Sequence, residues 1–223
     1  MFKTDSIAPE QIPYLGLLKS VLGYVDTENY TYGELFNEIN ANTGGINCGV
    51  EVFDRVDSTE EFQAMFSVRG KALYTKLDFL FKMIGEILNS SKLEDTKRLY
   101  EIVASVKSRA QVNLTGAGHS TAVLRAAAYS SPMAAFQDEM AGIGYYQFIE
   151  KLEKDFEQRK EETVEELCKL MKKILRPENF MISYIGERES METVQKLAGA
   201  VKAGLGTEPV EKIEREADLH KEK

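Results

Sequence analysis

The stretch that decides the fold runs from Ile12 to Phe53 and reads IPYLGLLKSVLGYVDTENYTYGELFNEINANTGGINCGVEVF. Its first part is apolar, and the apolar residues recur at helical spacing, which predicts a helix from Pro9 to about Tyr24. The apolar stripe is broad because Leu17 and Val21 lie beside its main row. A broad stripe is typical of a helix that is deeply buried against a sheet.

A turn and a second helix follow the first. Gly23 and the tyrosine-rich segment around Tyr30 interrupt the apolar pattern. Thr31 stands three residues before Glu34, the spacing at which a hydroxyl and a carboxylate cap a helix start reciprocally. We therefore expect a second helix over Glu34–Ile39.

Two alternating segments then predict a β-hairpin. Apolar residues occupy every second position in Gly45–Arg55 and again in Glu61–Arg69. The segment between them, Asp57-Ser58-Thr59, is polar and suits a turn. Upstream, Phe2 to Thr4 resembles the end of another strand.

The rest of the chain is mostly helical in pattern, with one further strand. Glycines at 116 and 118 interrupt one helical pattern, because glycine in a helix interior costs about 0.5–1 kcal/mol relative to alanine. The order of elements predicts an α+β fold, an antiparallel sheet with helices packed on one face. The expected elements are helices over Ala72–Leu88, from Glu94, and over Ser120–Tyr129, Met133–Met140, Glu161–Leu175 and Met191–Leu205, and a strand over Phe180–Gly186.

These elements resemble a segment of the insulinase-type (pitrilysin-type) zinc metallopeptidases. In that family a helix with inverted His-x-x-Glu-His precedes a glycine, a tyrosine-rich turn, a second helix and a strand entered through Asn-Ala-x-Thr. This chain keeps the frame and ends it in Asn40-Ala41-Asn42-Thr43. The positions of the two His and the Glu hold approximately Tyr14, Leu17 and Leu18, whose side chains supply no zinc ligand and no general base.

A second signature makes the resemblance more specific. It is SRAQVNLTGAGHSTAVLRAAAYSSPMAAFQDEMAGIGYYQFIEKLEKDFEQR, residues 108–159, with Gly-x-Gly-His, an alanine-rich helix, a Met-Gly-Gly-like turn and Tyr-x-x-Phe. From Pro9 to about Glu187 the chain is similar to the third domain of the presequence-protease branch of the family.

The resemblance implies a fold and a function. The expected fold is the metallopeptidase-like domain of the insulinase and mitochondrial processing peptidase type. Four such domains close as two halves around a peptide, and the first of them holds the zinc. This domain would be non-catalytic, would bind no cofactor itself, and would form part of the chamber wall. Its partners would be the other domains of the same chain, with a peptide as the parent enzyme's substrate.

The resemblance also gives domain limits. Residues 1–206 are expected to form one domain of a longer, bacterial type of chain. The charged stretch over 207–223 lacks an apolar stripe, so it is expected to be a linker tail.

Composition excludes several classes of function. The 36 acidic and 28 basic residues give a net charge of -8 with signs mixed along the chain, which argues against nucleic-acid binding. No apolar run is long enough to span a membrane, and the first residues lack a signal peptide's apolar core. Cys48 and Cys168 match no metal spacing, so we expect two reduced thiols in a cytoplasmic protein.

Two alternatives remain open at this point. His119 follows a glycine-rich segment and precedes Ser120, so an independent hydrolase would use these two side chains. Otherwise His119 and Arg125 are expected to line the chamber. The other alternative is a free-standing binding or scaffold protein that recruits a peptide by sheet-edge pairing. Apolar surface left without partner domains would favour self-association of the chain.

Overall fold

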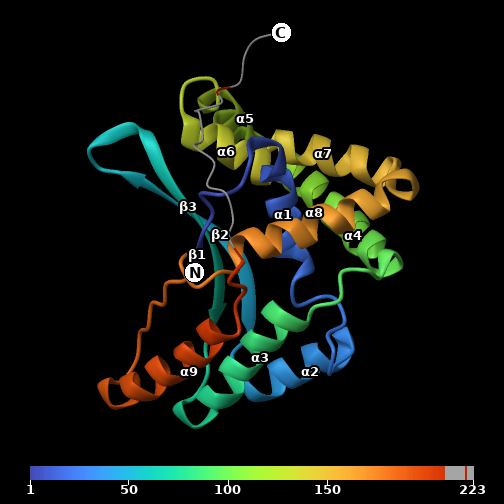
Figure 1. Cartoon of the computed structure of the whole chain (residues 1–223). Helices are drawn as coiled ribbons and strands as arrows, with labels where there is room; N and C mark the ends of the chain where they lie inside the picture. The colour runs from blue at the N-terminus through green and yellow to red at the C-terminus, as the bar shows by residue number, and fades with distance from the viewer. Residues whose placement is uncertain (209–218, 220–223) are drawn as a thin grey trace.

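The computed structural model describes residues 1–208 and Leu219 (Figure 1). Helices predominate, and a small antiparallel sheet lies among them, as expected for an α+β fold. The α-helices are α1 Ile12–Val21, α2 Tyr32–Asn42, α3 Leu77–Ser90, α4 Thr96–Gly116, α5 Gly118–Ala127, α6 Pro132–Ala141, α7 Ile143–Lys154, α8 Phe156–Ile174 and α9 Met191–Ala203. The strands are β1 Phe2–Lys3, β2 Ile46–Arg55 and β3 Ser58–Gly70.

The sheet has the order β1-β3-β2, and both pairs are antiparallel. Phe66 of β3 is the central residue, because it lies opposite Phe2 of β1 and Val50 of β2 and is fully buried. The predicted hairpin is therefore confirmed, although β3 begins at Ser58. Beyond a register shift between Asp54 and Arg55, the tip of the hairpin projects from the body of the molecule (Figure 1).

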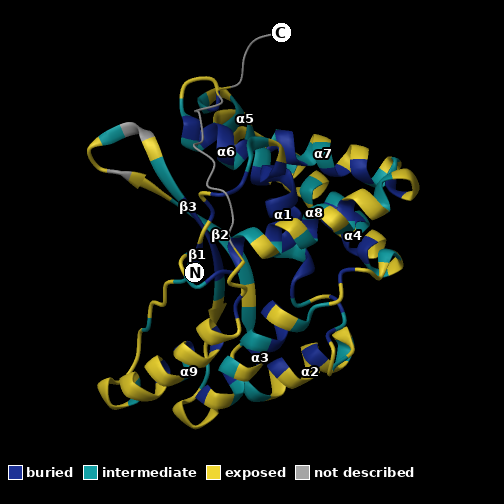
Figure 2. Ribbon diagram, in the orientation of Figure 1, coloured by how far each residue is buried: buried dark blue, intermediate teal, exposed yellow. Residues whose placement is uncertain are grey.

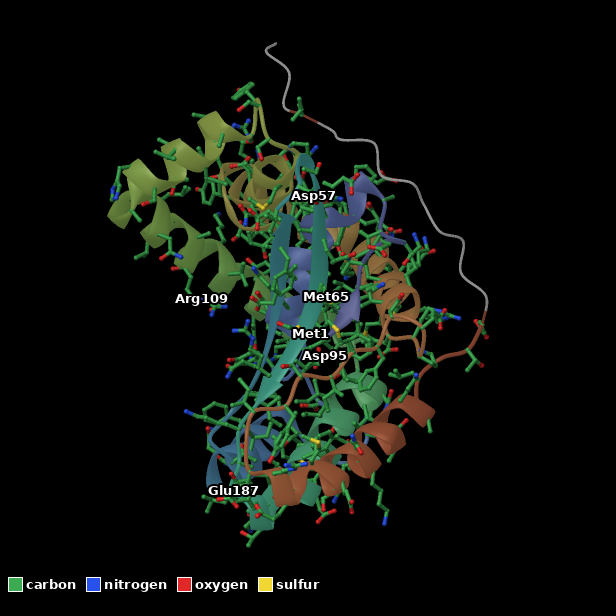
Figure 3. The ribbon with its side chains drawn as sticks, turned by 90° about the vertical axis from the view of Figure 1, so that its left-hand side faces the viewer. Met1, Asp57, Met65, Asp95, Arg109 and Glu187 are labelled. Atoms are coloured by element: carbon green, nitrogen blue, oxygen red, sulfur yellow. The ribbon has the colours of Figure 1, made fainter. Side chains whose placement is uncertain are left out.

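Helix α1 is the centre of the packing. Every residue from Ile12 to Leu18 is buried, and Figure 2 colours most of the helix accordingly. It contacts β2 on one side and α4, α6, α7 and α8 on the others. Figure 3 views the sheet from the opposite face and shows α1 behind the strands. The broad apolar stripe thus reflects burial on nearly all sides.

A glycine in α1 sets how closely its neighbours approach. A Cβ atom built on Gly16 would lie 2.5 Å from the backbone oxygen of Met140 and 2.7 Å from the ring of Tyr145. The backbones of α1 and α6 can therefore meet only while position 16 has no side chain. Gly16 thus serves close packing, since a helix interior otherwise disfavours glycine.

A second group of helices packs at one end of the sheet, where α3 contacts both α2 and α9 (Figure 1). The expected capping box is present, because the Thr31 hydroxyl accepts from the Glu34 amide and the Glu34 carboxylate accepts from the Thr31 amide. The turn before it is anchored to α3 by Glu86, which accepts hydrogen bonds from Asn29.

Two expectations about the C-terminal half were wrong. Residues 180–186 form no strand, because β1 is only two residues long and offers this segment a single bridge, Phe2 to Phe180. The long charged helix begins at Phe156 instead of Glu161, and α7 precedes it. Alternating charged and aromatic residues hid α7, whose apolar side packs on α4.

The predicted linker tail lies largely outside the described residues, since only 207, 208 and 219 are described there. Among the helices that are described, none combines the length and the hydrophobicity that crossing a membrane demands.

The role of Gly16 predicts opposite effects for the same substitution at two glycines. Gly16→Ala would lower the free energy of unfolding by about 1–3 kcal/mol, because the new methyl group overlaps the Met140 oxygen. Gly85→Ala in α3, where a Cβ meets nothing within 4 Å, would raise it by about 0.5–1 kcal/mol. Urea unfolding followed by circular dichroism measures both. Stabilisation by both substitutions would show that α1 and α6 do not pack this closely.

Candidate functional site

The main candidate is a groove of about 630 Å³ beside β2. Its floor is the strand from Ile46 to Glu51, and its walls come from the end of α1, from α2 and from α4. Tyr24 and Phe36 line it and are 48% and 55% exposed, so the groove is open to solvent and partly aromatic.

The outer edge of β2 faces this groove. Two hydrogen bonds fix which backbone groups point there: the Lys71 amide donates to the Gly45 oxygen, and the Thr4 amide donates to the Ala64 oxygen. Even-numbered residues of β3 therefore bond toward β1, and odd-numbered ones bond toward β2. By the register, Ile46, Cys48, Val50 and Val52 direct their amides and carbonyls away from the sheet. Across residues 46–52 of the described chain, these groups have no strand partner.

The charged residues in the groove are two cations and one anion. Glu51 is already bound to Arg69 at 2.6 Å on the sheet surface. Lys19 of α1 and Arg109 of α4 form no ion pair with any residue that the structure describes. Figure 3 shows Arg109 on α4, across from the edge of the sheet. The groove therefore favours a negative charge.

Lys19 is unusual for a lysine because it is largely withdrawn from water. Burial lowers the pKa of its ammonium group, which is the expected effect of removing a cation from water without a partner. An anion brought into the groove would offset that cost. Cys48 lies on the same strand, and burial raises the pKa of its thiol to about 12, so the thiol is not a ready nucleophile at neutral pH.

The three positions in α1 that the resemblance singled out lie outside the groove. Leu17 and Leu18 are fully buried among apolar side chains. Tyr14 points to α8, where its hydroxyl accepts from Arg159 at 2.8 Å and contacts Glu162. Burial, more than the nearby Glu162 carboxylate, raises the pKa of this hydroxyl. All three side chains thus serve the packing of α1, and their correspondence to lost ligands stays a prediction.

Zinc does not fit these residues. The side chains of Leu17 and Leu18 have no donor atom, and the Tyr14 hydroxyl is engaged with α8. Within residues 1–208, no group of three or more His, Cys, Asp and Glu side chains could hold a metal ion.

His119 and Arg125 both belong to α5 but do not form a common site. His119 is exposed in the first turn of the helix, as is Ser120. Arg125 is turned inward and binds the fully buried Asp138 of α6 at 2.5 Å. Asp138 also accepts from the backbone amides of Ile143 and Gly144, so this cluster joins α5, α6 and the start of α7. Arg125 therefore holds helices together.

Reasoning from the sequence missed the groove. Lys19 was the available signal, since it is the one charged residue in the apolar segment IPYLGLLKSV. Arg109 gave no such signal, because its distance from β2 depends on how α4 packs. Both cysteines are free thiols, as expected, and both are half-buried.

Comparison with known proteins finds one family and several relatives. Residues 1–152 match the sequence model of a family described as associated with the peptidases of metallopeptidase family 16, subfamily C. The chain is 31% identical over 220 residues to Protein HypA of Clostridium perfringens, which covers 99% of this chain and 22% of that protein.

Presequence proteases are also similar. The mitochondrial presequence protease of Yarrowia lipolytica is 29% identical over 155 residues, 70% of this chain and 16% of that protein. Presequence protease 1, chloroplastic/mitochondrial, of Arabidopsis thaliana is 24% identical over 196 residues, 88% of this chain and 18% of that protein. The chain thus spans roughly a fifth of the length of these relatives.

The Asp138 cluster yields a stability prediction. Asp138→Ala would lower the free energy of unfolding by about 3–5 kcal/mol, because it leaves the Arg125 guanidinium and two backbone amides without their acceptor. Glu161→Ala, an exposed carboxylate on α8, is the matched control and would change it by less than about 0.5 kcal/mol. Thermal and urea unfolding measure the difference. Equal effects of the two substitutions would contradict a structural role for the cluster.

Proposed function

Because the chain belongs to this family of peptidase-associated domains, we propose that it is a non-catalytic domain that forms part of the wall of a closed peptide-degrading chamber. The parent enzyme would be a zinc-dependent oligopeptidase whose metal lies outside these residues. The fold would be of the metallopeptidase-like type found in insulinases and mitochondrial processing peptidases. Residues 1–206 would form this domain, with 207–223 leading out of it.

The packing of α1 is the observation that carries the proposal. A helix that presents metal ligands must expose one face to a cavity, whereas α1 uses Tyr14, Leu17 and Leu18 for contacts with its neighbours. Catalytic zinc requires nitrogen, oxygen or sulfur donors and an activated water, which these side chains cannot supply. A family member with such a helix is suited to a structural role.

The relatives support the same assignment. Those named presequence proteases are several times longer than the matched region, so the other domains of one chain would be this domain's partners. A peptide would be the parent enzyme's substrate. Two of these relatives carry organelle names, so the cytoplasmic location expected from the cysteines stays a prediction.

The independent hydrolase has less support. A hydroxyl nucleophile needs a base within hydrogen-bonding reach and a third group to orient that base. His119 and Ser120 are exposed neighbours in the first turn of α5, and the described residues provide no hydrogen bond between them. The inward side of α5 is occupied by the Arg125–Asp138 pair.

Zinc content and peptide cleavage test the proposal. The purified chain should contain less than about a tenth of an equivalent of zinc by plasma mass spectrometry, because α1 offers no ligand set. It should also fail to cleave a quenched-fluorescence peptide library, with and without added zinc. Stoichiometric zinc together with turnover that a chelator abolishes would refute the non-catalytic assignment.

The reading frame provides the second measurement. Sequencing of the genomic DNA on both sides should reveal an upstream His-x-x-Glu-His in the same frame. Stop codons that isolate these residues would refute the proposal of a parent peptidase and would favour a free-standing binding protein. His119→Ala is the control for the hydrolase alternative, which requires that this substitution abolish a measured ester or amide hydrolysis.

A further inference from the structure

We infer that the edge of β2 is a peptide-binding site, which takes an extended segment as an added antiparallel or parallel strand and prefers one that carries a carboxylate side chain. The inference deepens the chamber-wall role by giving this wall a ligand. It concerns only this chain, however, and does not require that a parent enzyme contain zinc. The contacts that carry it are the free strand edge, two unpaired cations and the exposed aromatic wall.

The two edges of the sheet are treated differently. The β1 edge is two residues long, and it is covered where Met1 and Met181 exchange backbone hydrogen bonds and the Lys3 amide donates to Asn179. The β2 edge is ten residues long, and it contains neither proline nor lysine. Proteins usually protect an open edge with such residues, with a short strand, or with a bulge. The only irregularity in β2 comes at Asp54/Arg55, beyond the groove.

The groove has the length and direction of a strand. Residues 46–51 line it continuously, and six residues of strand extend over about 20 Å. Their outward amides and carbonyls, at Ile46, Cys48 and Val50, repeat at the spacing that a partner strand requires. In this mode of recognition the main chain supplies affinity and the surrounding side chains supply selectivity.

Charge complementarity selects the occupant. Lys19 and Arg109 stand on different helices and line the same groove, and the groove's carboxylate, Glu51, is bound to Arg69. A peptide carboxylate between them would gain two charge-assisted contacts, and that at Lys19 would offset the cost of its burial. A lysine or arginine side chain would be repelled. Tyr24 and Phe36 are placed to contact a neighbouring apolar side chain of the peptide.

The test uses the full chain and a capped octapeptide of alternating threonine and valine with one central glutamate. Isothermal titration calorimetry measures its affinity, and a version with N-methyl groups on alternate amides removes one edge of the added strand. Each lost backbone hydrogen bond weakens binding, so two or more should reduce affinity by about tenfold or more. A peptide with lysine in place of glutamate should bind about tenfold more weakly.

A charge swap identifies the cation. Arg109→Glu should weaken the glutamate peptide by about fivefold and strengthen the lysine peptide, because an exposed pair of charges contributes modestly. Arg109 is exposed, so the substitution should leave the thermal unfolding midpoint unchanged. Lys196→Glu, at an exposed position in the middle of α9, is the matched control and should leave both affinities unchanged.

Amide hydrogen exchange locates the peptide. The outward amides of Cys48 and Val50 should exchange rapidly in the free chain and become protected with peptide. Those of Asn47 and Gly49, which bond to β3, should be protected in both states.

Several results would overturn the inference. They are equal binding of the N-methylated peptide, absence of the charge swap, and protection of Cys48 and Val50 in the free chain by dimerisation, which sedimentation would reveal. Any of these would leave the non-catalytic assignment intact, because that rests on zinc content and cleavage.

Discussion

Burial of α1 on nearly every side is the constraint on which the rest of the structure depends. The helix lies between the sheet and four other helices, and Gly16 permits an approach to the Met140 backbone that any side chain would prevent. A helix in this position cannot also present ligands to a cavity. Only its last turn, from Lys19 onward, reaches solvent, and it does so in the groove beside β2. Packing thus moves the accessible chemistry from the middle of the helix to its end.

The sheet edge and the core have separate roles. The side chains of Cys48 and Val50 pack toward the hydrophobic core, whereas their backbone groups face the groove. Side chains leave a strand perpendicular to the direction of its hydrogen bonds, so one strand can complete a core and still offer an edge. The groove therefore needs no specialised side chain in its floor, and a domain without catalytic residues can retain recognition of extended peptides.

The sequence predicted local structure well and long-range contacts poorly. The hairpin, the Thr31–Glu34 cap and the buried α1 were predictable because periodicity and capping depend on neighbours in the chain. Residues 180–186 have an apolar pattern typical of a strand, yet a strand needs a partner of matching length, which β1 is not. Likewise, the groove depends on Lys19 and Arg109 coming together, which only the packing of α4 decides.

The projecting tip of the β2–β3 hairpin has a practical consequence. Val56 is completely exposed at the turn, and the register shift separates the tip from the part of the sheet that packs on the core. Loop tips of this kind tolerate inserted residues, because a longer turn changes no buried contact. An epitope tag or a fluorescent domain could be spliced between Val56 and Asp57, which would leave both the Gly16 contact and the groove untouched.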